Sequence, residues 1–248
     1  MPPVRRSATR RTTNTASHLP IKLIHSNRGT LPGLTPAETR LLRKKQDRLR
    51  LLRGALAKGA SAYGEHVTDA LNATFIFAQA EAGTAVCIHR DGWILTCAHC
   101  FGEDEQEWLG RRCRWVLGYT GLAVQIECRI WGWRRDLALA KVVSVELGIE
   151  SEVRNAGDSE GRLNGLIPGA DPQDNSSIGT LKHDAWTYWG HSGAPLVCMR
   201  TGVLLGLHSS WDESTAMRHG VPLVAIRNAR YCRGRQVKLN ILVLDDEN

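Results

Sequence analysis

The residues best suited to chemistry in this sequence are a histidine, an aspartate and a serine. His99 ends an apolar run, Asp136 opens another, and Ser192 lies between two glycines. A serine hydroxyl is a poor nucleophile until a base takes its proton, and a carboxylate usually holds that base in the right tautomer. The three residue types therefore predict attack by Ser192 on a carbonyl, with His99 as the base and Asp136 orienting it.

The serine stands in the turn Gly190-His191-Ser192-Gly193-Ala194-Pro195. Glycine lets the backbone turn sharply and approach a ligand closely. We expect this turn to expose the hydroxyl and to direct the N–H groups of Gly190 and Ser192 at a developing oxyanion. Each motif also has an ordinary interpretation, as a packed histidine, a turn aspartate or a plain turn. Their occurrence in one order, each beside a strand-like run, favours the catalytic interpretation.

The three motifs together resemble those of the chymotrypsin-fold, or trypsin-like, serine peptidases, especially the glutamyl-endopeptidase and HtrA-like branches. The matching segments are Thr96-Cys97-Ala98-His99-Cys100, Asp136-Leu137-Ala138-Leu139 and the serine turn at 190–195. This resemblance implies two antiparallel β-barrels of the six-stranded type over residues 70–230. It places His99 and Asp136 on the first barrel, Ser192 on the second, and the site in the cleft between them.

The residue pattern agrees with an all-β fold. From about residue 68 the chain consists of short apolar runs broken by glycine and charge, and Asp91-Gly92 is a strong hairpin signal. The stretch 144–175 is poor in such runs, and only 56 residues (192 minus 136) separate the aspartate from the serine. The second barrel is therefore expected either to be compact or to be truncated, and in the second case catalysis would be impaired.

Four residues are expected to bind substrate. By resemblance to glutamyl endopeptidases, Thr187 and His208 would read the side chain before the cleaved bond, which implies a preference for Glu or Gln. The alternative is that His208 is a satisfied core histidine. Ser209 and Trp211 would bond the main chain of an extended substrate, as an added strand does.

Where activated trypsin-like enzymes carry an aspartate before the serine, this chain has His191. Activation by a freshly cut N-terminus is therefore not expected.

The cysteines are odd in number and do not predict a disulfide framework. The resemblance would pair Cys100 with the position of Thr84, which is not a cysteine. We therefore expect no such bridge, and we expect the cysteines to be free thiols. Cys97 and Cys100 form a single Cys-x-x-Cys without the second pair that a four-cysteine zinc site requires. We expect no metal and no cofactor. The seven cysteines are Cys87, Cys97, Cys100, Cys113, Cys128, Cys198 and Cys232.

The net charge of +7 comes from the N-terminal part of the chain. Residues 1–60 contain ten Arg and four Lys against two acidic residues, a balance of +12, which leaves −5 for residues 61–248. We expect a disordered basic tail at 1–34, an amphipathic helix at 35–60, the peptidase domain at 61–235 and a C-terminal tail at 236–248. Thr35, Pro36 and Glu38 form the start signal of that helix.

The basic tail leaves three interpretations open: a solvated tail, which is favoured, a mitochondrial presequence, or contact with nucleic acid. No apolar run is long enough to span a bilayer, and no secretory signal follows the basic start. We expect an intracellular, cytoplasmic protein, with a mitochondrial location as the alternative. Two functions stay open: a serine endopeptidase acting on protein or peptide substrates, and a catalytically impaired peptidase fold that binds peptides.

Overall fold

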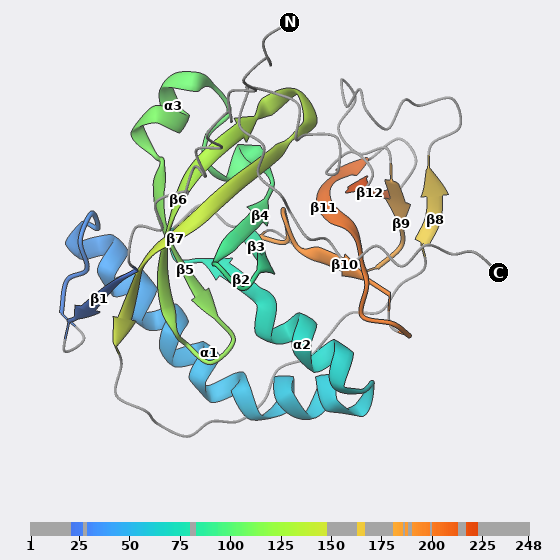
Figure 1. Cartoon of the computed structure of the whole chain (residues 1–248), viewed down its shortest axis with the longest axis horizontal. Coiled ribbons are helices and arrows are strands. Elements are labelled where there is room, and N and C mark those ends of the chain that lie inside the picture. Colours follow the sequence, from blue (N-terminus) through green and yellow to red (C-terminus); the bar gives the residue numbers. More distant parts are fainter. Residues whose placement is uncertain are drawn as a thin grey trace, which may run out of the picture.

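The computed structural model describes residues 21–26, 29–79, 83–147, 163–166, 181–185, 187, 190–198, 200–212 and 217–222. Two β-sheets dominate this part of the chain, and helices lie against the larger sheet (Figure 1). The predicted tails at 1–34 and 236–248 lie largely or wholly outside the described residues, as does most of the stretch 148–180. The all-β fold class is confirmed.

The first sheet contains a closed antiparallel barrel of six strands. Its order is β7-β4-β3-β2-β5-β6, and pairing of β6 with β7 closes it. A buried cluster that includes Phe77, Ile94, Phe101 and Ile126 fills its interior, since alternate residues of each strand face inward. The predicted first barrel is thus confirmed. The strands are β2 (Thr74–Phe77), β3 (Thr84–His89), β4 (Trp93–Thr96), β5 (Cys113–Gly118), β6 (Ala123–Gly132) and β7 (Leu137–Leu147).

Short helical segments follow two of these strands and carry the site. After β4 the chain forms the 3₁₀-helix η1 (Ala98–Cys100) and then α3 (Glu105–Gly110). Between β6 and β7 it forms the 3₁₀-helix η2 (Trp133–Arg135).

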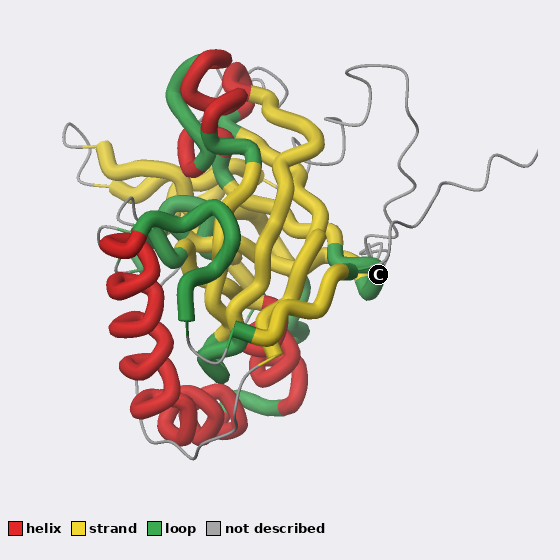
Figure 2. Tube along the Cα trace, turned by 90° about the vertical axis from the view of Figure 1, so that its left-hand side faces the viewer, coloured by secondary structure: helices red, strands yellow, loops and turns green. Residues whose placement is uncertain are grey.

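The N-terminal segment adds a strand and two helices to the barrel. Strand β1 (Lys22–His25) pairs in parallel with β7, α1 spans Pro36–Ala62, and α2 (Glu65–Ala73) leads into β2. Thr35 and Glu38 make the capping box that starts α1. Figure 2 shows this helix running along one side of the strands. The expected N-terminal helix is confirmed.

Helix α1 and the residues just before it are held against the barrel by apolar and polar contacts. Leu31 and Leu42 are buried in a cluster with Trp115, whose indole donates to the carbonyl of Pro32 at 3.0 Å.

Within the described residues no helix is both long and apolar enough to cross a membrane.

The second sheet has five antiparallel strands in the order β10-β11-β12-β9-β8. It packs on the first barrel through a shared apolar cluster, in which Leu207 and Val221 contact side chains such as Val86 and Leu139. The second barrel is thus supported in part, by five strands over the described residues. These are β8 (Leu163–Leu166), β9 (Leu181–His183), β10 (Pro195–Val197), β11 (Leu204–Asp212) and β12 (Met217–Pro222).

Candidate active site

His99 and Asp136 are brought together by the pairing of β4 with β7. These strands are antiparallel, and Thr96 at the end of β4 lies opposite Ala138 near the start of β7. The residues just beyond Thr96 therefore meet those just before Ala138. His99 lies on η1 and Asp136 is the residue that ends η2.

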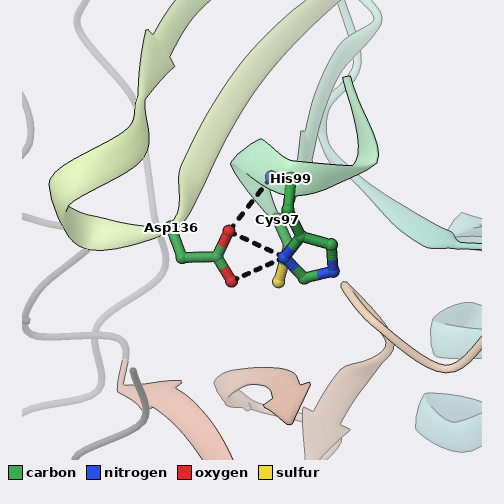
Figure 3. Close-up of side chains that lie close together, drawn as sticks. All are labelled: Cys97, His99 and Asp136. Atoms are coloured by element: carbon green, nitrogen blue, oxygen red, sulfur yellow. Dashed lines mark hydrogen bonds and ion pairs between the residues drawn. The ribbon is translucent and has the colours of Figure 1, made fainter. Parts of the chain in front are cut away.

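The two side chains form a closely bonded pair (Figure 3). His99 Nδ1 lies 2.9 Å from Oδ1 and 3.0 Å from Oδ2 of Asp136, and the His99 backbone N–H donates to Oδ1 at 3.1 Å. The Asp136 side chain is 6% exposed and that of His99 is 37% exposed. The carboxylate is thus buried behind an imidazole that is open to solvent on one side.

The backbone of Asp136 adopts an uncommon conformation. Its φ of 47° and ψ of 42° lie in the left-handed region, which Asp and Asn enter more readily than most residues. Such conformations persist where surrounding contacts hold them and often occur at functional sites. The hydrogen bonds to His99 provide those contacts.

The serine turn is held against the first barrel by Thr84. The Thr84 N–H donates to the Ser192 carbonyl at 2.7 Å, and its hydroxyl donates to the Gly190 carbonyl at 2.8 Å. Gly193 has a φ of 83°, and a Cβ there would clash with the Thr84 carbonyl and the Thr96 hydroxyl. Thr84 stands where the resemblance would place a disulfide partner of Cys100. Here it fixes the serine turn by hydrogen bonds. The six cysteines that the structure describes are free thiols.

The two halves of the site meet at Ser209 on β11. Its hydroxyl donates to Asp136 Oδ2 at 2.8 Å, and its carbonyl accepts a hydrogen bond from Ser192 Oγ at 3.3 Å. Ser209 is buried. Ser209 therefore connects the Asp136 carboxylate of the first barrel with the Ser192 hydroxyl in the turn that precedes β10.

The charges of the pair support each other. Burial lowers the pKa of His99, but the hydrogen bonds and charges of Asp136 and Cys100 outweigh burial and raise it to about 10. Burial raises the pKa of Asp136, but its hydrogen bonds with His99 and Ser209 and the His99 charge bring the pKa below its ordinary value. Asp136 is therefore a carboxylate at neutral pH and stabilises the imidazolium.

Cys97 completes a group with His99 and Asp136 whose potential ligand atoms lie within 4.8 Å of one another. The thiol is fully buried and donates to the His208 carbonyl at 3.4 Å. Burial, followed by the negative charge of Asp136, raises the pKa of Cys97 well above the ordinary value. Because metal ligation requires the thiolate and His99 already bonds the carboxylate, the group fits a histidine–aspartate pair better than a metal site.

The N–H groups predicted to form an oxyanion hole belong to Gly190 and Ser192. Gly190 has a φ of 101°, a conformation that favours glycine. Within the described part of the turn, neither N–H is used in a backbone hydrogen bond. Their role in binding an oxyanion stays a prediction.

The predicted substrate-binding residues lie on or beside the second sheet. His208 is buried and its Nδ1 lies 3.1 Å from Nε2 of His183. Thr187 accepts a hydrogen bond from Arg218 Nε at 2.8 Å, and the Trp211 side chain is exposed.

Nothing in the sequence indicated the contacts that Thr84, His183 and Arg218 make here. No local motif marks them, because strand register rather than chain proximity brings them to the site.

A six-stranded barrel joined to a second antiparallel sheet, with a histidine–aspartate pair beside a serine turn, defines the chymotrypsin-type class of fold. Residues 83–159 match the family model of the trypsin-like peptidase domain. This match includes His99 and Asp136 and confirms the resemblance expected from the motifs.

Solved structures of proteases are also similar to this chain. The Rv3671c protease in its inactive form is 15% identical with a TM-score of 0.47, over 70% of this chain and 92% of that chain. A mutant of Rv3671c from M. tuberculosis H37Rv is 15% identical with a TM-score of 0.48, over 68% and 93%. A serine endoprotease from Yersinia pestis is 21% identical with a TM-score of 0.45, over 66% and 64%. No curated protein matches the chain.

Proposed function

We propose that this protein is a serine endopeptidase in which Ser192 is the nucleophile, His99 the general base and Asp136 the residue that orients His99. The match to the trypsin-like peptidase family supports a serine hydrolase with a protein substrate. The observation that carries the proposal is the link through Ser209, whose hydroxyl bonds Asp136 and whose carbonyl bonds Ser192. It links the hydroxyl to the histidine–aspartate pair through a single residue, which supports a catalytic role for all three.

The reaction follows from these positions. His99 Nδ1 is held by Asp136, which leaves Nε2 to take the Ser192 proton as Oγ attacks the peptide carbonyl. The N–H groups of Gly190 and Ser192 would stabilise the oxyanion. His99 then gives the proton to the leaving amine, which leaves an acyl-enzyme. A water molecule, deprotonated by the same imidazole, releases the acid and restores Ser192.

Ser192 must turn before it reacts. Its single hydroxyl proton is donated to the Ser209 carbonyl at 3.3 Å, so it is not donated to His99 in this conformation. We expect substrate binding to turn the hydroxyl from the Ser209 carbonyl toward His99. Catalytic hydrogen bonds are often loose without substrate and tighten when substrate binds.

The alternative is a peptidase fold that binds peptides without cutting them. The bond from Ser192 to Ser209 favours this function if it persists when a peptide is bound. In that case Ser209 and Trp211 would bind the main chain of a peptide, and the predicted preference for Glu or Gln would select which peptide is bound.

A fluorophosphonate probe, which labels activated serines covalently, separates the two functions. We expect the full-length protein to be labelled and Ser192→Ala to lose labelling entirely. Ser61→Ala, on the exposed part of α1, should be labelled like wild type and serves as the matched control. Absence of labelling in protein whose circular dichroism shows it to be folded would overturn the catalytic proposal.

A further inference from the structure

Arg218 is held at the predicted specificity site by contacts from two other segments. On β12 it lies opposite Trp211 of β11 and His183 of β9. Its Nε donates to the Thr187 hydroxyl at 2.8 Å, and its Cζ lies 4.8 Å from the centroid of the Trp211 ring. The guanidinium is thus fixed on one edge by a hydroxyl and on one face by an indole, whose π-face attracts a cation.

This location is close to the proposed nucleophile along the strand. Ser209, whose carbonyl accepts the Ser192 hydroxyl, is two residues before Trp211 on β11. At about 3.3 Å per residue, Trp211 lies roughly 7 Å further along. Arg218 is directly across from Trp211, so its side chain shares a face of the sheet with it. Thr187 precedes Ser192 by five residues. The guanidinium is therefore within reach of the substrate side chain beside the cleaved bond.

The fixed charge at this site belongs to Arg218 rather than to the neighbouring histidines. Burial, followed by the charge of Arg218, lowers the pKa of His183 to about 4. Burial, followed by the charges of His183, His191 and then Arg218, lowers the pKa of His208 to about 3. Both imidazoles are therefore neutral at pH 7. An arginine guanidinium stays charged at this pH.

Donor capacity remains on the guanidinium. Its Nε is used by Thr187, whereas across the described residues neither Nη atom of Arg218 has a hydrogen-bond or ion-pair partner. The two Nη groups form a planar fork that matches the two oxygens of a carboxylate.

We propose that Arg218 determines specificity by binding the carboxylate of a glutamate immediately before the cleaved bond. This inference rests on the proposed function and assigns its acidic preference to a residue other than His208. A neutral imidazole and a hydroxyl bond a carboxylate and a carboxamide alike, whereas a guanidinium with two open donors favours the charged group. The protein then distinguishes Glu from Gln.

The test compares peptides that differ only in Glu or Gln before the cleaved bond. For wild type we expect kcat/KM to be about 10- to 100-fold higher for Glu, the value of a charge-assisted hydrogen-bond pair. Arg218→Gln should bring this ratio close to one, chiefly by loss of the Glu substrate. Arg218→Lys, which keeps the charge but loses the fork, should keep an intermediate ratio and provides a second variant if the glutamine variant does not fold.

Arg112→Gln is the matched control, since Arg112 also lies over a tryptophan, Trp108, at 5.6 Å but on the first barrel. It should leave the Glu-to-Gln ratio unchanged. A ratio near one in wild type, or a ratio that survives in Arg218→Gln, would overturn the role of Arg218.

A binding measurement keeps this inference separate from the proposed catalysis. N-acetylated peptide amides ending in Glu or Gln are titrated into Ser192→Ala, with and without Arg218→Gln, and followed by calorimetry. Tighter binding of the Glu peptide that disappears with Arg218→Gln supports the role of Arg218 even if the fluorophosphonate fails to label wild type. Equal binding of both peptides contradicts it even if labelling succeeds.

Discussion

At the scale of single residues, Asp136 does most to define the site. It accepts hydrogen bonds from the ring and backbone of His99 and from the Ser209 hydroxyl, in a left-handed conformation that its own side chain makes accessible. Its charge raises the pKa of His99. This carboxylate therefore both orients the proposed base and, together with Cys100, raises its pKa.

The effect of Asp136 on the pKa of His99 predicts how kcat/KM depends on pH. His99 acts as a base only when deprotonated, so activity is lost as pH falls through its pKa. Because Asp136 raises that pKa, the ascending limb of kcat/KM should lie above pH 6.5, the ordinary value for histidine. Asp136→Asn, which tolerates the same backbone conformation, should move the limb to lower pH and reduce kcat by about 10⁴-fold. A limb that stays in place in this variant would show that Asp136 does not set the pKa of His99.

At the scale of elements, α1 is joined to β7 by a buried ion pair. Arg43 Nη2 lies 2.7 Å from Glu146 Oε1 and Nη1 lies 2.8 Å from Oε2, and Ser26 and Gln46 also bond this carboxylate. Burial raises the pKa of Glu146, but these partners bring it below its ordinary value. Helix α1 is thus bound to strand β7 of the barrel through the Glu146 side chain.

Removal of one charge from this pair should be costly. Glu146→Gln removes the negative charge that Arg43 contacts in this buried pair, and we expect the free energy of unfolding to fall by about 3–5 kcal/mol. Glu127→Gln, in a more exposed pair with Arg112 and Arg129, should cost about 1 kcal/mol or less. Urea unfolding measures both. Equal small losses would mean that α1 is not anchored by this pair.

At the scale of the whole molecule, the proposed function requires the second sheet to dock on the first barrel. The contact is apolar and centres on Leu207, which is fully buried beside Val86, Leu95 and Leu139. Leu207 precedes His208 and Ser209 on β11, so the same strand carries the contact and the site. We therefore expect docking of the sheet and alignment of Ser192 with His99 to be coupled.

Leu207→Ala tests this coupling. The cavity should lower the free energy of unfolding by about 2–5 kcal/mol and also slow fluorophosphonate labelling at temperatures where the protein stays folded. Leu109→Ala, at an exposed position of α3, should change stability by less than about 0.5 kcal/mol and leave labelling unchanged. Normal labelling of Leu207→Ala would show that the site is aligned independently of this contact.

The sequence by itself determined the residue types, their order and the class of fold. His99, Asp136 and Ser192 each lie in a short local motif, and the alternation of apolar residues and turn signals predicts antiparallel strands. The capping box at Thr35 is also local, which is why the helix start is readable without a structure.

Only the tertiary structure decided which side chains share the site. Ser209 reaches Asp136, Thr84 reaches the serine turn, and Arg218 reaches Thr187 through the register of strands or loops that are far apart in the chain. A shift of one residue in that register would turn each strand side chain to the other face, and no single segment encodes the register. The charge at the proposed specificity site also depends on the tertiary structure, because burial lowers the pKa of His208 while strand pairing brings Arg218 of β12 opposite Trp211.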